Sequence, residues 1–396
     1  MPPAIQGKPK NKMRPELELV ICSARPNSPE NDERIRELLG KGLNWTDVLA
    51  YASEHKLGAF LRERLSALDS AWLPPDQKKK LDELGRELAK NNLAYMGEML
   101  WLCGTFEAAG IPAIPFKGPA LAWFAYPNFA HRTCVDLDFI LPQRYIPEAK
   151  ELLEHNGYAP QFDPIEAQAG AHRPAPGQYA FAPSGKRSHV ELHTERTLRY
   201  FSRPLDLDEI NSRVIHLEIG GRNLRTFSVE DQLVMLCVHG AKHFWERLAW
   251  IMDIAQLIAA REVDWPLLTE TASKMESTRV LLLGLDLAHT LFDAPLPAQL
   301  LDEIGRDRAV RDLAEKVYER YAGISDQSAG VLHRAVFRFR LRDGIRQGLR
   351  HTLHLALSPT ESDRQAVGLP CWLTPLYMLV RPWRLLREYG LGSKRR

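Results

Sequence analysis

Residues 111–141 have the sequence IPAIPFKGPALAWFAYPNFAHRTCVDLDFIL, and this stretch decides which fold is predicted. It begins with a short apolar run, Ile111–Phe116, which is typical of a buried strand. The next three residues, Lys117-Gly118-Pro119, predict a turn, and Ala120–Tyr126 can form a helix after it. The stretch therefore predicts a strand, a turn and the start of a helix, in that order.

The turn has the composition of an anion-binding site. Gly118 has no Cβ, so a ligand can approach the backbone closely there. Pro119 suits the first position of a helix, where its missing amide proton costs no hydrogen bond. The free N–H groups of a helix start attract anions, and Lys117 adds a positive charge on a flexible side chain. We expect these three residues to bind phosphate.

A second strand is predicted at Val135–Leu141, with two carboxylates on one face. Successive side chains of a strand point to opposite faces, so Asp136 and Asp138 share one side and the apolar residues share the other. Two like charges this close repel one another unless a cation lies between them. Carboxylate oxygens suit Mg²⁺, which also takes substrate phosphates as ligands. Each motif alone is common in turns and strand ends, and it is their order along the chain that is informative.

A family resemblance rests on these residues. The segment Phe116–Leu121, followed by Arg132 and Asp136-Leu137-Asp138-Phe139, resembles the uncharacterised nucleotidyltransferase family of the polymerase-β-type superfamily. More distantly it resembles the nucleotidyltransferase toxins of bacterial toxin–antitoxin systems. Later stretches carry the same resemblance: His189-Val190-Glu191-Leu192-His193, Val238-His239-Gly240-Ala241-Lys242-His243, Trp245, Arg247-Leu248, Trp250 and Asp253. The superfamily usually has Gly-Ser where this chain has Lys117-Gly118.

The resemblance implies an α+β fold, in which a small mixed-sheet nucleotidyltransferase core is flanked by N- and C-terminal helical regions. It implies transfer of a nucleoside monophosphate from a nucleoside triphosphate such as ATP to a hydroxyl, with Mg²⁺ or Mn²⁺ as cofactor. Glu191 takes the place of the third catalytic carboxylate and metal ligand, beside Asp136 and Asp138. Arg132 is expected to brace the turn or bind a phosphate, or else to form an ion pair with a nearby acid.

Glu191 lies in a predicted β-hairpin. The hairpin joins Gln178–Pro183 to Arg187–His193 and follows a Pro/Ala/Gly-rich loop at residues 159–176. On its second strand His189, Glu191 and His193 project to one side, so His193 is a candidate for the cleft. A zinc site made by these three residues is an alternative, although no motif for an open coordination position accompanies it.

A long helix is predicted from Ser228 to Ala260. Polar and aromatic residues at alternating four- and three-residue steps form one stripe between apolar flanks: His239, His243, Glu246, Trp250 and Asp253. A cleft explains such a stripe, and an exposed face with two chance histidines is the alternative. Lys242 lies next to the stripe and could reach a triphosphate. Trp245 and Trp250 could stack a base, although core packing is commoner for tryptophan.

Composition and segmentation place the chain among ordinary globular proteins. The net charge of +2 predicts no bulk attraction to nucleic acid, and five scattered cysteines predict neither a disulfide framework nor a structural zinc site. No signal peptide or membrane span is apparent, so we expect a cytoplasmic protein. The predicted segments are a disordered tail (1–15), a helical N-terminal region (16–107), the α/β core (108–227) and a helical C-terminal region (228–396).

The last third of the chain carries a series of arginines. They are spaced by four residues, which predicts a slanted basic ridge on a helix: Arg334, Arg338, Arg342, Arg346 and Arg350. The ridge could contact RNA, or it could be a solvated basic face. Two functional alternatives therefore accompany the main hypothesis: a toxin-like enzyme that modifies tRNA or other RNA, and an inactive nucleotide-binding regulatory protein. The acceptor, whether small molecule, protein or RNA, is not predicted.

Overall fold

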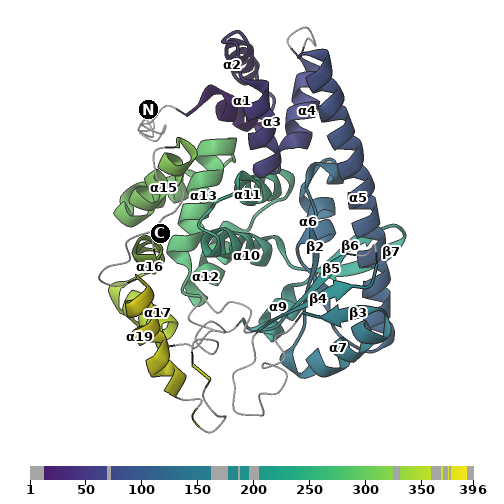
Figure 1. The fold of residues 1–396 in the computed structure, drawn as a ribbon, viewed down its shortest axis with the longest axis vertical. Coiled ribbons are helices and arrows are strands. Elements are labelled where there is room, and N and C mark those ends of the chain that lie inside the picture. Colours follow the sequence, from purple (N-terminus) through teal and green to yellow (C-terminus); the bar gives the residue numbers. More distant parts are fainter. Residues whose placement is uncertain are drawn as a thin grey trace.

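A computed structural model describes residues 13–68, 73–161, 177–185, 188–195, 205–323, 331–357, 367–368, 373 and 376–389. The predicted tail (1–15) and the Pro/Ala/Gly-rich loop (159–176) lie largely outside these ranges. A five-stranded sheet and a two-stranded sheet stand between two groups of helices, which confirms the α+β class (Figure 1). None of the helices in the described ranges is long and apolar enough to cross a membrane.

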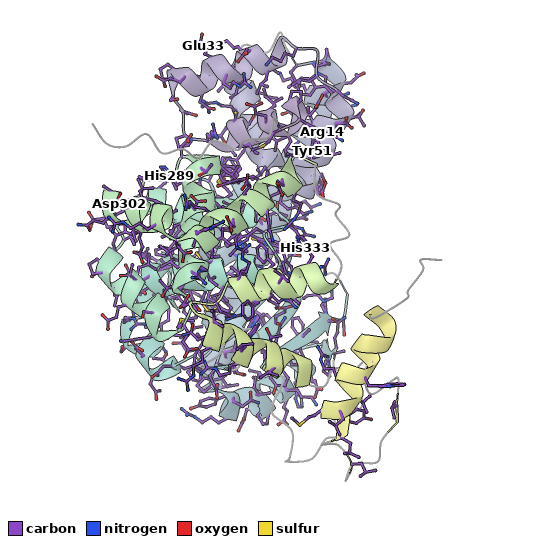
Figure 2. All side chains as sticks on the ribbon, turned by 90° about the vertical axis from the view of Figure 1, so that its left-hand side faces the viewer. Arg14, Glu33, Tyr51, His289, Asp302 and His333 are labelled. Carbon is purple, nitrogen blue, oxygen red and sulfur yellow. The ribbon has the colours of Figure 1, made fainter. Side chains whose placement is uncertain are left out.

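The described part of the N-terminal region is helical, as the sequence predicts. Its helices are α1 (Pro15–Ala24), α2 (Pro29–Leu39), α3 (Trp45–Glu54), α4 (Gly58–Ala67) and α5 (Pro75–Ala108). The start of α3 follows from capping, because the backbone N–H of Thr46 donates to Asn44 Oδ1 over 3.0 Å. At the start of α1, a guanidinium nitrogen of Arg14 lies 3.3 Å from the hydroxyl of Tyr51 (Figure 2). This contact joins the beginning of the described chain to α3.

The main sheet brings the two predicted carboxylate strands side by side. Its strands are β1 (Ile114–Pro115), β2 (Asp136–Ile140), β3 (Tyr158–Pro160), β4 (Gln178–Pro183) and β5 (His189–His193), in the order β1-β2-β5-β4-β3. Strands β2 and β5 are parallel, with Asp138 opposite Glu191, and the other neighbours are antiparallel. The predicted β4–β5 hairpin is confirmed. Strand β3 lies where the sequence predicts the beginning of a loop.

The two faces of this sheet have different surroundings. On one face Phe139 packs against Phe106 of α5, with ring centroids 5.3 Å apart, and α5 runs along the sheet in Figure 1. The other face carries the polar residues of β2 and β5 beside a small second core, in which Phe116 stacks on Phe227 at 5.1 Å. This second core lies beside α9 (Leu207–Arg213) and the hairpin of β6 (Ile215–Ile219) and β7 (Arg222–Thr226). Helix α7 (Ile146–His155) joins β2 to β3.

The predicted single helix from Ser228 to Ala260 is wrong. The structure has two helices, α10 (Val229–Lys242) and α11 (Leu248–Ala260), separated by a turn in which Phe244 and Trp245 have φ of 56° and 54°. Trp245 is fully buried against Gly240, where a Cβ would lie 2.0 Å from the indole ring. Trp245 is therefore a core residue and does not stack a base. The start of α10 is capped, since Ser228 Oγ accepts from the backbone N–H of Asp231 at 3.1 Å.

Helix α13 is the centre of the C-terminal helices and packs against α10, α11 and α15 (Figure 1). The helices in this part are α12 (Trp265–Lys274), α13 (Thr278–Phe292), α14 (Ala298–Arg306), α15 (Arg308–Tyr321), α16 (Val331–Arg340), α17 (Ile345–Leu357) and α19 (Tyr377–Tyr389). Helix α19 packs on α17.

The predicted arginine ridge is also wrong, because α16 and α17 are separate helices. Arg342 lies between them and is 3% exposed, with Nη2 at 3.1 Å from Nε2 of His351. Arg338 covers the ring of Phe244 at 4.8 Å, and Arg350 pairs with Glu276 of the α12–α13 connection. Arg334 also lies over the ring of Phe244, at 5.5 Å, so four of the five arginines contact other parts of the body. Arg334, Arg346 and Arg350 are exposed, whereas the buried Arg342 interrupts the series.

Candidate active site

Asp138 is the centre of a buried polar cluster on the sheet. Its Oδ1 atom lies 3.1 Å from Nζ of Lys117 and 2.8 Å from Nε2 of His193. Burial alone would raise the pKa of this carboxyl, but the positive charge of Lys117 and the hydrogen bond with His193 outweigh it. The pKa of Asp138 is consequently held far below its usual range, and the group is an anion at neutral pH.

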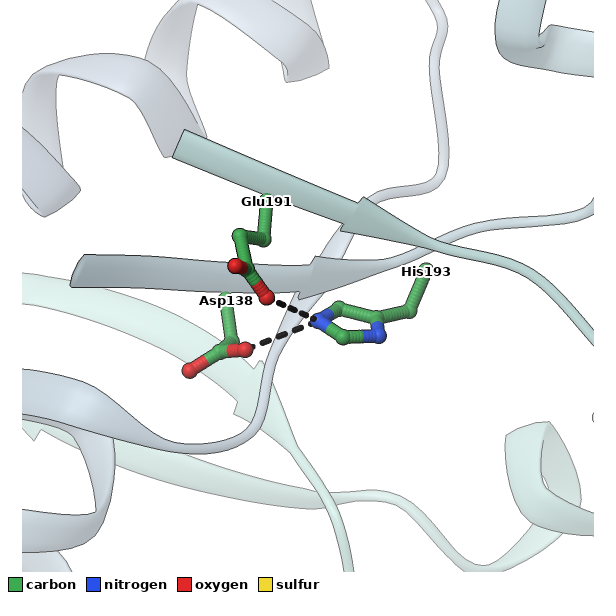
Figure 3. Close-up of side chains that lie close together, drawn as sticks. All are labelled: Asp138, Glu191 and His193. Atoms are coloured by element: carbon green, nitrogen blue, oxygen red, sulfur yellow. Dashed lines mark hydrogen bonds and ion pairs between the residues drawn. The ribbon is translucent and has the colours of Figure 1, made fainter. Parts of the chain in front are cut away.

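Glu191 meets Asp138 across the two parallel strands. His193 Nε2 lies 3.4 Å from Glu191 Oε2, and Gln178 Nε2 donates to the same oxygen over 2.7 Å. Burial would raise the pKa of Glu191, but the contact with His193 lowers it below its usual value. Figure 3 shows the three side chains converging, and one ligand atom from each lies within 4.8 Å of the others.

This donor set fits a divalent cation. Two carboxylates and one imidazole surround one point. Asp138 and His193 are buried away from competing water, and Glu191 is partly buried. Carboxylate oxygens suit Mg²⁺ and Mn²⁺, while an imidazole nitrogen shifts the preference from Mg²⁺ toward a transition metal. His189 is exposed and outside the group, so the zinc alternative that uses both histidines is not formed. His193, expected in the cleft or in that zinc site, lies with Asp138 and Glu191 in the group that could hold a cation.

Asp136 lies on the same face of β2 as Asp138, two residues before it. Its carboxylate is not among the atoms that converge within 4.8 Å. Burial, followed by the negative charge of Asp138, raises the pKa of Asp136 to about 7, although Lys117 acts in the opposite direction. The structure thus brings Asp138, Glu191 and His193 together and leaves Asp136 at the edge, where the sequence predicts Asp136, Asp138 and Glu191 as the trio.

The Lys117-Gly118 turn closes one side of this cluster. Helix α6 (Gly118–Ala125) begins there, with Pro119 in its first turn. Gly118 has φ of +53°, and a Cβ at this position would lie 2.9 Å from the carbonyl oxygen of Asp136. Only glycine meets both conditions without strain. The turn therefore presents the start of α6 and the Lys117 side chain next to the carboxylates.

Beneath this turn lies a buried ion pair. Arg132 makes two hydrogen bonds to Asp253 of α11, at 2.8 and 3.0 Å, and Nη1 donates to the carbonyl of Gly118 at 3.1 Å. The hydroxyl of Tyr126 donates to the same carboxylate at 2.6 Å. Asp253 is 3% exposed, so it lies under the turn and not on a cleft wall. Of the expected roles for Arg132, the ion pair and the bracing contact are the ones formed.

Lys242 and three rings of the predicted stripe lie on another side of the polar cluster. Lys242 Nζ is 3.4 Å from Oε1 of Gln178, the residue whose amide donates to Glu191. The rings of His239 and His243 are 4.8 Å apart, and Trp250 lies 5.5 and 4.9 Å from them. The break between α10 and α11 brings these rings together, whereas Glu246 points to solvent. We call His239, His243 and Trp250 the ring cluster.

The comparisons with known proteins are consistent with this geometry. Residues 41–293, more than half of the chain, match a family described as "Uncharacterised nucleotidyltransferase". The matched part contains the carboxylates, the Lys117-Gly118 turn and the ring cluster. Neither the search of curated proteins nor the search of solved structures found a match.

Proposed function

This chain belongs to the uncharacterised nucleotidyltransferase family, and we propose that it moves a nucleoside monophosphate from a nucleoside triphosphate to a hydroxyl. The observation that carries the proposal is the position of Asp138 opposite Glu191 on parallel strands, with Lys117 at 3.1 Å and the start of α6 beside them. Such an arrangement offers ligands for a cation and donors for phosphate at one place.

The proposed metal ligands are Asp138 and Glu191, joined by His193, with Asp136 completing the site from the edge. A divalent cation bound there would neutralise the triphosphate and the charge that develops on the leaving pyrophosphate. Burial and the negative charge of Asp138 raise the pKa of Asp136 to about 7, and a cation bound beside this carboxylate would offset both effects. Glu191 could alternatively accept the proton of the acceptor hydroxyl.

The proposed phosphate contacts come from the turn. The backbone N–H groups at the start of α6 would face a phosphate, and Gly118 allows it to come close. Lys117 has a flexible side chain and can exchange its contact with Asp138 for one with a phosphate oxygen. Arg132 contributes indirectly, since it holds the carbonyl of Gly118 and thereby the conformation of the turn.

Pyrophosphate release tests the proposal. We expect release from at least one nucleoside triphosphate that requires Mg²⁺ or Mn²⁺ and an acceptor from a cell extract. Asp138→Asn and Glu191→Gln should each lower the rate by at least about 100-fold, as removal of electrostatic stabilisation in an active site does. His189→Ala, on the same strand but outside the donor set, is the matched control and should leave the rate unchanged. Equal rates in all variants would refute the proposed site.

A second candidate, a nucleotide-binding protein without turnover, is favoured by one observation. Oδ1 of Asp138 already contacts both Lys117 and His193, so its charge is compensated by the protein itself. Binding of triphosphate without any release of pyrophosphate would support this candidate.

The acceptor remains to be assigned by experiment. Label transfer from a triphosphate to tRNA, protein or small-molecule fractions would distinguish a toxin-like RNA enzyme from the other possibilities. The arginine series that favours RNA from the sequence does not form one surface in the structure, so RNA has no structural advantage over the other acceptors.

A further inference from the structure

The ring cluster is a partly exposed group of three mutually inclined rings that the chemistry proposed above does not use. His239 and His243 are one helical turn apart near the end of α10, and Trp250 comes from α11. The ring of Trp250 is perpendicular to that of His239, at 86°, and tilted by 34° to that of His243. All three residues are intermediate between buried and exposed, and each ring packs against the other two.

The two imidazoles are uncharged at neutral pH. Burial, together with the positive charges of Lys242 and Lys117, lowers the pKa of His243 to about 4. Burial and the charge of Lys117 also hold the pKa of His239 well below its usual value. Neither ring can therefore act as a cation that holds phosphate, and His243 is too weak a base to accept a proton efficiently near pH 7.

The ring cluster is next to the carboxylates. The neighbouring Lys242 reaches Gln178, whose amide is bonded to Glu191. A ligand that lies on the rings can thus extend to the phosphate-binding turn.

We propose that His239, His243 and Trp250 bind the nucleobase of the triphosphate. This inference rests on the proposed function and names the part of the substrate that this surface recognises. Bases stack on aromatic side chains because every base has a flat π-face. A neutral imidazole also offers one hydrogen-bond donor and one acceptor, which suit the polar edge of a base. Arg247, 5.7 Å above the ring of Trp250, adds a charge that favours an electron-rich base.

Binding measurements separate the base from the phosphates. Titration calorimetry with Mn²⁺ would compare α,β-methylene nucleoside triphosphates, which cannot react at the α-phosphate, with inorganic triphosphate. We expect wild-type protein to bind the nucleotides more tightly than inorganic triphosphate. Trp250→Ala should weaken nucleotide binding by about 10-fold or more, as loss of one stacking partner does, and leave inorganic triphosphate unaffected. His243→Ala should act in the same direction.

Two further variants control for folding. Trp250→Phe keeps an aromatic face and should retain most of the nucleotide affinity. Trp101→Ala removes a 37% exposed tryptophan from α5, on the opposite face of the sheet, and should change neither affinity. The inference would be overturned if wild-type protein bound nucleotides and inorganic triphosphate with equal affinity. It would also be overturned if Trp250→Ala weakened the binding of both ligands equally. If binding depends on the base but no pyrophosphate is released, the proposed nucleotidyl transfer is refuted. The proposed binding of the nucleobase to the ring cluster is then still supported.

Discussion

At the scale of single residues, the ion pair of Arg132 with Asp253 supports the Lys117-Gly118 turn. Asp253 is 3% exposed, and both of its oxygens accept from the guanidinium. A buried pair of this kind is costly to break, because the remaining charge has no partner. Arg132 also donates a hydrogen bond to the carbonyl of Gly118. Loss of the ion pair should therefore change the conformation of the Lys117-Gly118 turn.

We therefore expect Asp253→Asn to lower the free energy of unfolding by about 3 kcal/mol. Urea denaturation would measure this change. Asp302→Asn is the matched control, because Asp302 pairs with Arg306 at 3.0 Å on the surface, with both side chains more than half exposed. It should change stability by less than about 0.5 kcal/mol. In Asp253→Asn protein that stays folded, the KM for triphosphate should rise. Unchanged stability would mean that the pair does not support the turn.

Sequence reasoning predicted some of these residues and not others, for a physical reason. Gly118 and the Asp136/Asp138 pair are visible in the sequence because local geometry, a turn and a strand alternation, determines their positions. His193 was placed on the correct side of its strand by the same alternation. The partners of Asp253 were not predictable, because Arg132 precedes it by 121 residues and only the packed fold brings them together.

At the scale of elements, packing explains the break between α10 and α11. The helical pattern continues through residues 240–248, so the sequence alone favours one helix. Gly240 leaves room for the indole of Trp245, which turns the chain back onto α10 and α13. Burial of a large aromatic side chain outweighs the loss of a few helical hydrogen bonds.

Gly240→Ala should therefore destabilise the protein, because the new Cβ would lie 2.0 Å from the ring of Trp245. Overpacking of a rigid core typically costs about 1–3 kcal/mol. Gly305→Ala in α14 is the control, since nothing lies within 4 Å of its Cβ position. That change should be neutral or stabilising by about 0.5 kcal/mol. Thermal unfolding of both variants would compare them, and similar melting temperatures would contradict this explanation of the break.

A buried histidine between α3 and α15 makes the contact of these helices sensitive to acid. His55 is 5% exposed, and its ring lies edge-on to Tyr321 at 5.5 Å. Burial, with a smaller effect of Arg247, lowers the pKa of His55 to about 4. In the unfolded chain the pKa of a histidine is about 6.5. Because the folded protein disfavours the charged ring, the protein loses stability as the pH falls from about 6.5 toward 4.

When the pH is lowered from 7.5 to 5, protonation linked to His55 alone should lower the free energy of unfolding by about 2 kcal/mol. His55→Phe keeps the ring and removes the titration, so it should be less acid-sensitive than wild-type protein by about this amount. Urea denaturation at the two pH values gives the comparison. The same loss in both proteins would show that other groups cause the acid sensitivity.

At the scale of the whole molecule, the order of helices, sheet and helices was predictable from the residue patterns together with the family resemblance. The arrangement of strands was not, because β2 and β5 are parallel neighbours separated in the chain by α7, β3 and β4. The family resemblance placed Glu191 beside the aspartates, whereas no local pattern did so. The arginine series failed for the opposite reason: its spacing suggests one helix, but burial of Arg342 requires two.

One hydrophobic core crosses every segment boundary proposed from the sequence. It includes Leu17 of α1, Leu121 of α6, Phe139 of β2, Leu236 of α10 and Leu313 of α15. Because these faces are buried against one another, a segment that folded alone would expose much of its apolar surface. We therefore predict that residues 16–107, 108–227 and 228–323 unfold together. Circular dichroism and tryptophan fluorescence should report coincident urea transitions, and isolated 16–107 should lack a cooperative transition. Separate transitions in the intact chain would show that the segments are independent domains.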